Sequence, residues 1–179
     1  KNFEFIIIDD GSVDNSLAIL ESFKDNRIKL VKKKNNAGYT SLLNESINYA
    51  KYDYLARMDS DDVSNKDRLL KQFKFLEKNK DYSVVGSNIR LINTKGEFIR
   101  NGKYPETDEQ IKSNLSNFST FAHPACLIRK KKLIDIGGYR TIFEPSEDYD
   151  LWTRLALNSK MYNIQEYLLD YRVHGKSVS

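Results

Sequence analysis

The chain has 179 residues, of which 40% are hydrophobic and 12% aromatic, so its length and composition fit a single domain built on one core. Its 29 basic and 25 acidic residues give a formal charge of +4, and this near balance argues against a nucleic-acid partner. A single cysteine, Cys126, excludes an internal disulfide and favours a reducing compartment, and no apolar run reaches the length of a membrane span or signal peptide.

Strands and helices are predicted to alternate through the first half of the chain. Lys1–Phe3 runs directly into an apolar strand without an initiator methionine, so we expect a chain that is truncated at its N-terminus. Apolar runs and apolar residues at helical spacing then predict strand 5–8, helix 17–23, strand 28–31, helix 42–50, strand 52–58 and helix 69–76.

This order predicts an α/β fold with a mainly parallel sheet covered by helices on both faces. In such sheets, ligands bind beyond the carboxyl ends of the strands. Two acidic segments, Asp9–Asp10 and Asp59–Asp62, follow strands in this way. The second half is less regular: it predicts a strand hairpin over 84–99, a helix over 108–115, a strand over 125–128 and a short helix before Gly137.

The segment Asp59–Asp62 carries three carboxylates within four residues at the end of a strand. Like charges this close repel each other unless a cation or a donor-rich ligand lies between them. Oxygen ligands select Mg²⁺ or Mn²⁺, and a site with few protein ligands completes its coordination with water and phosphate oxygens. A capped turn is the competing interpretation, because Asp and Ser also form turns.

Two further polar segments are candidates for chemistry. Glu147, Asp148 and Asp150 open a helix after a potential N-cap, Ser146, where the helix dipole favours negative charge and a fixed carboxylate could act as a general base. Near the C-terminal end lies His174, one of two histidines, which on its own is more often a surface or core residue than a ligand.

Taken in order and spacing, these segments resemble the family 2 glycosyltransferases along essentially the whole chain. The segments that carry the resemblance are Phe5–Ser16, Asn36–Gly38, Ala56–Asp62, Gly137–Tyr139 and Glu147–Trp152. The resemblance implies a single GT-A domain over residues 1–179 that lacks the family's first strand and helix, with a Rossmann-like mixed sheet and helices on both faces. It implies a nucleotide-binding half over 1–80 and an acceptor-side half over 81–179. It implies inverting transfer of a sugar from a nucleotide diphosphate, with a UDP-sugar as the expected donor and a saccharide or a lipid-linked molecule as acceptor.

The resemblance also assigns roles residue by residue. Asp10 matches the carboxylate that accepts from the nucleotide base, and Asp59 matches the residue near the ribose and sugar. Asp61 matches the ligand of the DXD motif that holds Mn²⁺ or Mg²⁺, and His174 resembles a histidine that helps to hold the metal or the diphosphate. Asp148 matches the catalytic base.

Arg57 and the Gly137–Gly138 loop are expected near the donor. The setting implied is polysaccharide assembly in the cytoplasm, with peripheral association at the inner face of a membrane. Two alternatives stay open at this point: a sugar-phosphate nucleotidyltransferase, although no glycine-rich phosphate loop is present, and a non-catalytic homologue whose acidic loops bind a cation or a nucleotide.

Overall fold

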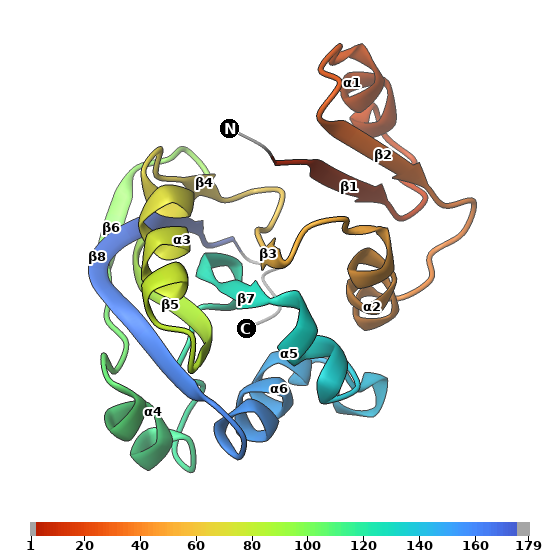
Figure 1. The fold of residues 1–179 in the computed structure, drawn as a ribbon. Coiled ribbons are helices and arrows are strands. Elements are labelled where there is room, and N and C mark those ends of the chain that lie inside the picture. Colours follow the sequence, from red (N-terminus) through yellow and green to blue (C-terminus); the bar gives the residue numbers. More distant parts are fainter. Residues whose placement is uncertain (1–2, 175–179) are drawn as a thin grey trace.

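The computed structural model describes residues 3–174, and Figure 1 shows their course. The elements in chain order are β1 (Phe5–Asp9), α1 (Ser16–Ser22), β2 (Ile28–Lys32), α2 (Tyr39–Tyr49), β3 (Tyr54–Ala56), β4 (Val63–Ser64), α3 (Arg68–Lys78), β5 (Tyr82–Ile92), β6 (Phe98–Gly102), α4 (Asp108–Asn114), β7 (Leu127–Arg129), α5 (Lys130–Asp135), α6 (Glu147–Ala156) and β8 (Lys160–Arg172). Short 3₁₀ turns cover His123–Ala125 and Thr141–Phe143.

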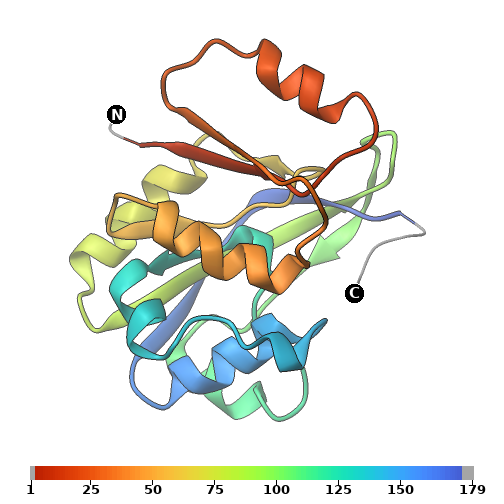
Figure 2. The same ribbon diagram turned by 90° about the vertical axis from the view of Figure 1, so that its right-hand side faces the viewer.

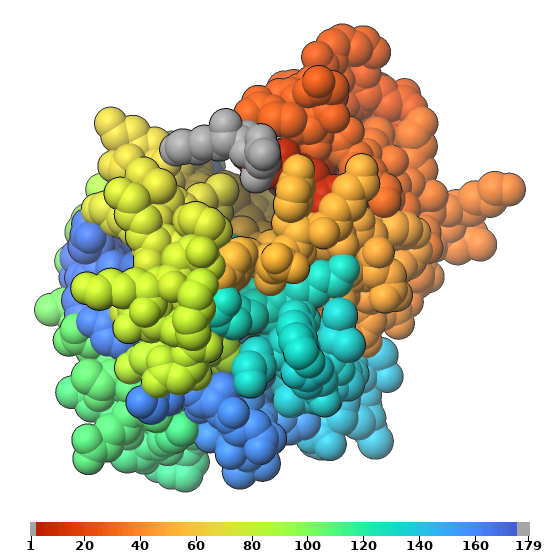
Figure 3. Space-filling model, viewed as in Figure 1, coloured from red at the N-terminus to blue at the C-terminus, as the bar shows by residue number. Residues whose placement is uncertain are grey.

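The strands form two sheets. β1 and β2 pair in parallel as a small sheet, with Phe5 opposite Ile28 and Asp9 opposite Lys32. The other strands form a six-stranded sheet in the order β3-β7-β5-β8-β4, with β6 paired to β5. In Figures 1 and 2, α2 lies between the small sheet and helices α5 and α6. Figure 3 shows the same division on the surface, where the red and orange residues of the small sheet and α1 occupy the upper right.

The expected α/β class with a mixed sheet is correct, but the expectation of mainly parallel pairing is wrong. β1–β2 and β5–β8 are parallel, whereas β3–β7, β5–β7, β5–β6 and β4–β8 are antiparallel. The β5–β6 hairpin is one physical reason, because a short turn can join only antiparallel neighbours. The regular alternation of the first half does not continue past α3.

Helices cover both faces of the large sheet, as predicted. Alternate residues of a strand point to opposite faces. Val84 and Ile128 belong to the cluster that includes side chains of α2, α4, α5 and α6, among them Trp152. Their neighbours Val85 and Leu127 pack with Leu76 of α3 in a separate cluster. The core of the molecule therefore lies in two layers, one on each side of this sheet.

The longest strand, β8, was not predicted. It pairs with β5 in parallel and with β4 in antiparallel, where Val63 lies opposite Asp170. This pairing brings the C-terminal end of β8 beside the acidic segment that joins β3 to β4.

Within residues 3–174, none of the helices combines the length and the hydropathy that crossing a membrane requires.

Candidate donor-binding and catalytic site

The acidic segment between β3 and β4 is held by residues at the end of β8. The backbone N–H of Arg172 donates to Asp62 Oδ1 at 2.9 Å, and Arg172 Nε donates to the Asp61 carbonyl oxygen at 2.8 Å. His174 Nε2 lies 3.2 Å from Asp61 Oδ2, although the two residues are 113 positions apart in the sequence. The structure therefore brings the two predicted metal ligands together.

Asp62 adds a buried negative group to this segment. The residue is 7% exposed, and its Oδ2 atom has no hydrogen-bond partner among the described residues. Burial raises the pKa of the Asp62 carboxyl to about 6, and the neighbouring charges of Asp59 and Asp61 add to this effect. The loop therefore concentrates carboxylate oxygens, the ligand type that Mg²⁺ and Mn²⁺ prefer.

The described part of the chain does not gather three or more His, Cys, Asp or Glu side chains into a metal centre. A cation at this position would have Asp61 and His174 as protein ligands and would need further oxygens from water or a bound diphosphate. Such an open site suits Mg²⁺ or Mn²⁺, which retain several non-protein ligands in nucleotide-binding enzymes. The residues present therefore fit the metal that the sequence predicts.

Arg57 lies beside the acidic segment, immediately after β3. Its side chain is 13% exposed, and its Nη1 donates to Asp59 Oδ2 at 2.7 Å. Its second terminal nitrogen contacts both Asp59 and the hydroxyl of Tyr39, the first residue of α2. Burial raises the pKa of Asp59, while the Arg57 charge opposes this rise. Arg68, buried at the start of α3, donates to the Arg57 carbonyl at 3.1 Å and fixes the strand end.

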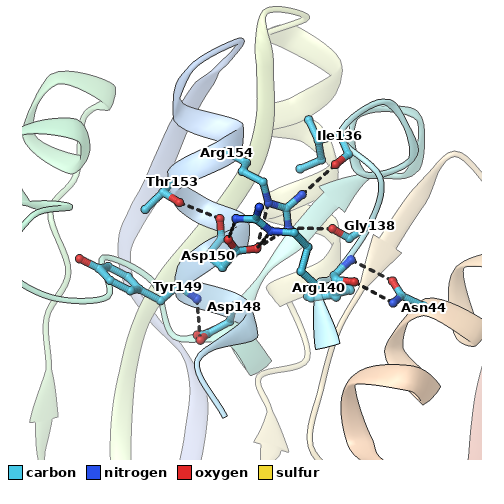
Figure 4. A network of polar contacts seen from close by, with 10 residues as sticks. Asn44, Ile136, Gly138, Arg140, Asp148, Tyr149, Asp150, Thr153 and Arg154 are labelled. Carbon is cyan, nitrogen blue, oxygen red and sulfur yellow. Dashed lines mark hydrogen bonds and ion pairs between the residues drawn. The ribbon is translucent and has the colours of Figure 1, made fainter. Parts of the chain in front are cut away.

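Asp148 lies in the first turn of α6, as predicted, and its Oδ1 accepts the N–H of Tyr149 at 2.7 Å (Figure 4). Burial raises the pKa of Asp148, and the Tyr149 N–H and the positive charge of Arg57 oppose this rise. Arg57 also acts on the pKa of the preceding residue, Glu147. Arg57 is thus close enough to the start of α6 to influence both carboxyls. Ser146 occupies the N-cap position, but its side chain makes no capping hydrogen bond, contrary to expectation.

Asp10 follows β1 and connects two loops. Its Oδ1 accepts the backbone N–H of Ala37 at 2.8 Å, and Ala37 lies in the loop that leads into α2. Gly38 takes a φ of +86° just before the helix, a conformation that glycine adopts without steric cost. Because α2 begins with Tyr39, Asp10 is linked through this loop to the residue that contacts Arg57.

The Gly137–Gly138 loop ends α5 and packs on α2. Both glycines have positive φ, +81° and +70°. A Cβ atom on Gly138 would lie 2.6 Å from Asn44 Oδ1 of α2. The structure thus gives Gly138 a packing role, and contact of either glycine with a donor stays a prediction.

Comparison with known proteins identifies the family. A family model described as Glycosyl transferase family 2 matches residues 1–137, well over half of the chain. The chain belongs to glycosyltransferase family 2. The O-antigen biosynthesis glycosyltransferase WbnJ of Escherichia coli is 40% identical over 186 residues, covering 99% of this chain and 70% of WbnJ. The UDP-Gal:alpha-D-GlcNAc-diphosphoundecaprenol beta-1,3-galactosyltransferase of Escherichia coli is 32% identical, covering 94% of this chain and 62% of that enzyme.

Solved structures show that this family 2 chain has the GT-A fold. Residues 1–349 of TarS from S. aureus, in complex with UDP, align with a TM-score of 0.73 at 21% identity, covering 96% of this chain and 51% of that one. The mannosyltransferase PcManGT from Pyrobaculum calidifontis, in complex with GDP-Man and Mn²⁺, aligns with a TM-score of 0.71 at 15% identity, covering 97% and 49%. The chain thus spans about half the length of these structures.

Three residues that organise this candidate site were not predicted from sequence. Tyr39 contacts Arg57, Arg172 anchors the acidic segment, and Arg68 supports the end of β3. Arg172 stands two residues before His174, so its position near a candidate ligand was the available signal. Tyr39 directly follows Asn36–Gly38, one of the segments that carry the resemblance, and this was its available signal. The neighbourhood of Arg68 does not distinguish it from a surface residue of an amphipathic helix.

Proposed function

We propose that this protein is an inverting, metal-dependent glycosyltransferase that moves a sugar from a UDP-sugar to a saccharide or a lipid-linked acceptor. Family membership supports the transferase class. The observation that carries the finer proposal is the approach of Asp61 Oδ2 to His174 Nε2 at 3.2 Å, beside the buried carboxylate of Asp62. The UDP bound to TarS and the UDP-galactose named for the galactosyltransferase favour UDP as the nucleotide.

Asp61 and His174 are proposed to hold Mn²⁺ or Mg²⁺, and the Mn²⁺ of the mannosyltransferase complex supports this choice. When bound, the metal would neutralise the charge that develops on the leaving diphosphate. Arg57 places a second positive charge at the same edge of the sheet, held in position by Asp59 and Tyr39.

Asp148 is proposed as the general base that takes the proton from the acceptor hydroxyl. Attack of this hydroxyl on the anomeric carbon from the side opposite the diphosphate inverts its configuration in one displacement. This route needs no nucleophile from the protein. The influence of the Arg57 charge on the pKa of Asp148 supports this role.

The donor would bind along residues 1–80, with Asp10 accepting from the uracil N–H and Asp59 near the ribose and sugar, and the Gly137–Gly138 loop close by. The acceptor would bind along residues 81–179. The diphosphoundecaprenol acceptor named for the galactosyltransferase supports a lipid-linked acceptor, and hence an enzyme in the cytoplasm, peripherally associated with the inner face of a membrane in polysaccharide assembly.

Product analysis tests this function. The protein is incubated with UDP-galactose, UDP-glucose, UDP-N-acetylglucosamine or GDP-mannose, with Mn²⁺ or EDTA, together with saccharide and polyprenyl diphosphate acceptors. The proposal predicts UDP and a β-linked product from an α-linked UDP-sugar, in the presence of Mn²⁺ only. In a parallel incubation with UTP and a sugar phosphate, release of pyrophosphate would instead identify a nucleotidyltransferase. Nucleotide binding without any product would identify a non-catalytic homologue.

A further inference from the structure

Asp150 is the centre of a polar network two residues after the proposed base. Its side chain is 5% exposed and lies between two arginines, which Figure 4 shows converging on one carboxylate. Arg154 Nε donates to Asp150 Oδ2 at 2.9 Å, and Arg140 Nε donates to the same oxygen at 3.0 Å. Burial alone would raise the pKa of Asp150, but the hydrogen bonds from Arg140 and Arg154 outweigh it, and the pKa is lowered. Asp150 is therefore a fixed anion.

The remaining nitrogens of Arg154 reach the loop that follows α5. Nη1 donates to the Ile136 carbonyl and Nη2 to the Gly138 carbonyl, each at 2.8 Å. Arg154 is 16% exposed, so these bonds are largely shielded from water. The Arg154 side chain thus connects helix α6 to the backbone of the loop through these two hydrogen bonds.

The same loop is fastened to α2 from its other side. Asn44 Nδ2 donates to the Tyr139 carbonyl and Asn44 Oδ1 accepts the Tyr139 N–H, both at 2.8 Å. α2 begins at Tyr39, which contacts Arg57, and α6 begins with the turn that carries Asp148. The loop therefore joins the helix that faces the donor side to the helix that carries the base.

We propose that Asn44, Asp150 and Arg154 are positioning residues that hold Asp148 at a fixed place relative to Arg57 and the donor. The inference rests on the proposed function. Each polar group of the network described above has a hydrogen-bond partner. Buried polar networks that are fully paired favour one arrangement of the elements they join. A carboxylate base works only when its oxygen lies within about 2.6–3.2 Å of the hydroxyl oxygen whose proton it takes. A displacement of about 1 Å can cost on the order of 100-fold in rate.

The test compares Arg154→Gln with Arg140→Ala. Both changes remove a partner of Asp150, but Arg140 is 49% exposed and its hydrogen bonds reach only Asp150, so it serves as the matched control. Turnover is measured with the donor and acceptor that give most product in the panel above, and affinity is measured by calorimetry with UDP and Mn²⁺. Arg154→Gln should lower kcat by about 10- to 100-fold, with UDP affinity within about two-fold of the parent, and Arg140→Ala should lower kcat by less than about three-fold.

A double-mutant cycle separates positioning from simple loss of fold. If Arg154 acts through Asp148, Arg154→Gln should cause no further loss in an Asp148→Asn background, whereas an independent structural defect would multiply the two losses. Asn44→Ala enters the same cycle from α2, so a poorly folding Arg154 variant leaves the proposal testable. Multiplicative losses, or equal turnover of the Arg154 and Arg140 variants, would overturn the inference. Near-parental turnover of Asp148→Asn alone would instead overturn the proposed base.

Discussion

Replacing Asp148 with Asn separates a catalytic base from a partner of the helix dipole. Asn keeps the shape, and its side-chain oxygen can still accept the Tyr149 N–H. Loss of a general base costs on the order of 100- to 10,000-fold in rate, or about 3–5 kcal/mol of transition-state stabilisation. A favourable dipole contact contributes only about 0.3–1 kcal/mol to stability. We therefore expect transfer to collapse while UDP affinity stays near that of the parent.

The effect on stability has the opposite sign to that of a lost dipole partner. Burial raises the pKa of Asp148 in the folded state, so its ionised form is less favourable there than in the unfolded chain. Stability from this group falls as pH rises through the raised pKa, and Asn removes that cost. The melting temperature at pH 7 should therefore stay equal or rise.

Initial rates across pH 4–8 and thermal melts test both statements. In the parent, transfer should fall as the solution is acidified through a pKa above the usual value of about 3.9, because the base must be ionised. Asp150→Asn is the contrasting variant, because it leaves two arginines without their shared anion and should destabilise the fold by about 3 kcal/mol. Near-parental turnover of Asp148→Asn, or a lower melting temperature, would refute the reasoning.

Three further changes probe other parts of the molecule. Asp10→Asn can retain the bond from Ala37 N–H but adds a donor, so calorimetry should show a weaker preference for UDP over GDP, and unchanged selectivity would reduce Asp10 to a loop residue. Gly138→Ala should destabilise the protein by about 1–3 kcal/mol in urea titrations. Gly137→Ala is the control and should destabilise it less, because Gly137 also has a positive φ but no close neighbour. Equal effects of the two substitutions would disprove the clash with Asn44. Burial lowers the pKa of His123 well below 6.5, so at pH values below about 6.5 only the unfolded chain takes up the proton. The melting temperature should therefore fall as the pH drops below about 6.5, and this pH dependence should weaken in His123→Gln.

Local patterns predicted the parts of the fold that depend on neighbouring residues. The apolar run of β1, the turn between β5 and β6 and the acidic start of α6 each have a signal within a few positions, and each forms as expected. β8 has no such signal, because its pairing with β5 shifts register at several points and its buried residues do not alternate regularly. Because β8 was not predicted, the sequence offered no structural reason for His174 to lie near Asp61.

The tertiary contacts of charged side chains were the other feature that the sequence did not predict. Arg129 and Lys130 belong to the basic run Arg129–Lys132, a pattern that is more often a solvated face. In the structure, Arg129 Nε donates to the Tyr82 carbonyl at 2.8 Å and Lys130 Nζ donates to the Ala50 carbonyl at 2.6 Å. Both side chains thus stabilise the fold by donating to backbone carbonyls that are distant in sequence. Only the tertiary arrangement distinguishes such residues from a solvated patch.

Calorimetric titration with UDP tests the metal-diphosphate site most directly. The parent, Asp61→Ala and His174→Ala are each titrated in Mn²⁺ and in EDTA, and thermal melts check that the variants fold. The site built by Asp61 and His174 predicts tight UDP binding by the parent in Mn²⁺ only, loss of this metal dependence in Asp61→Ala and a smaller loss in His174→Ala. Equal UDP affinity of the parent with Mn²⁺ and with EDTA, matched by the Asp61 variant, would contradict it.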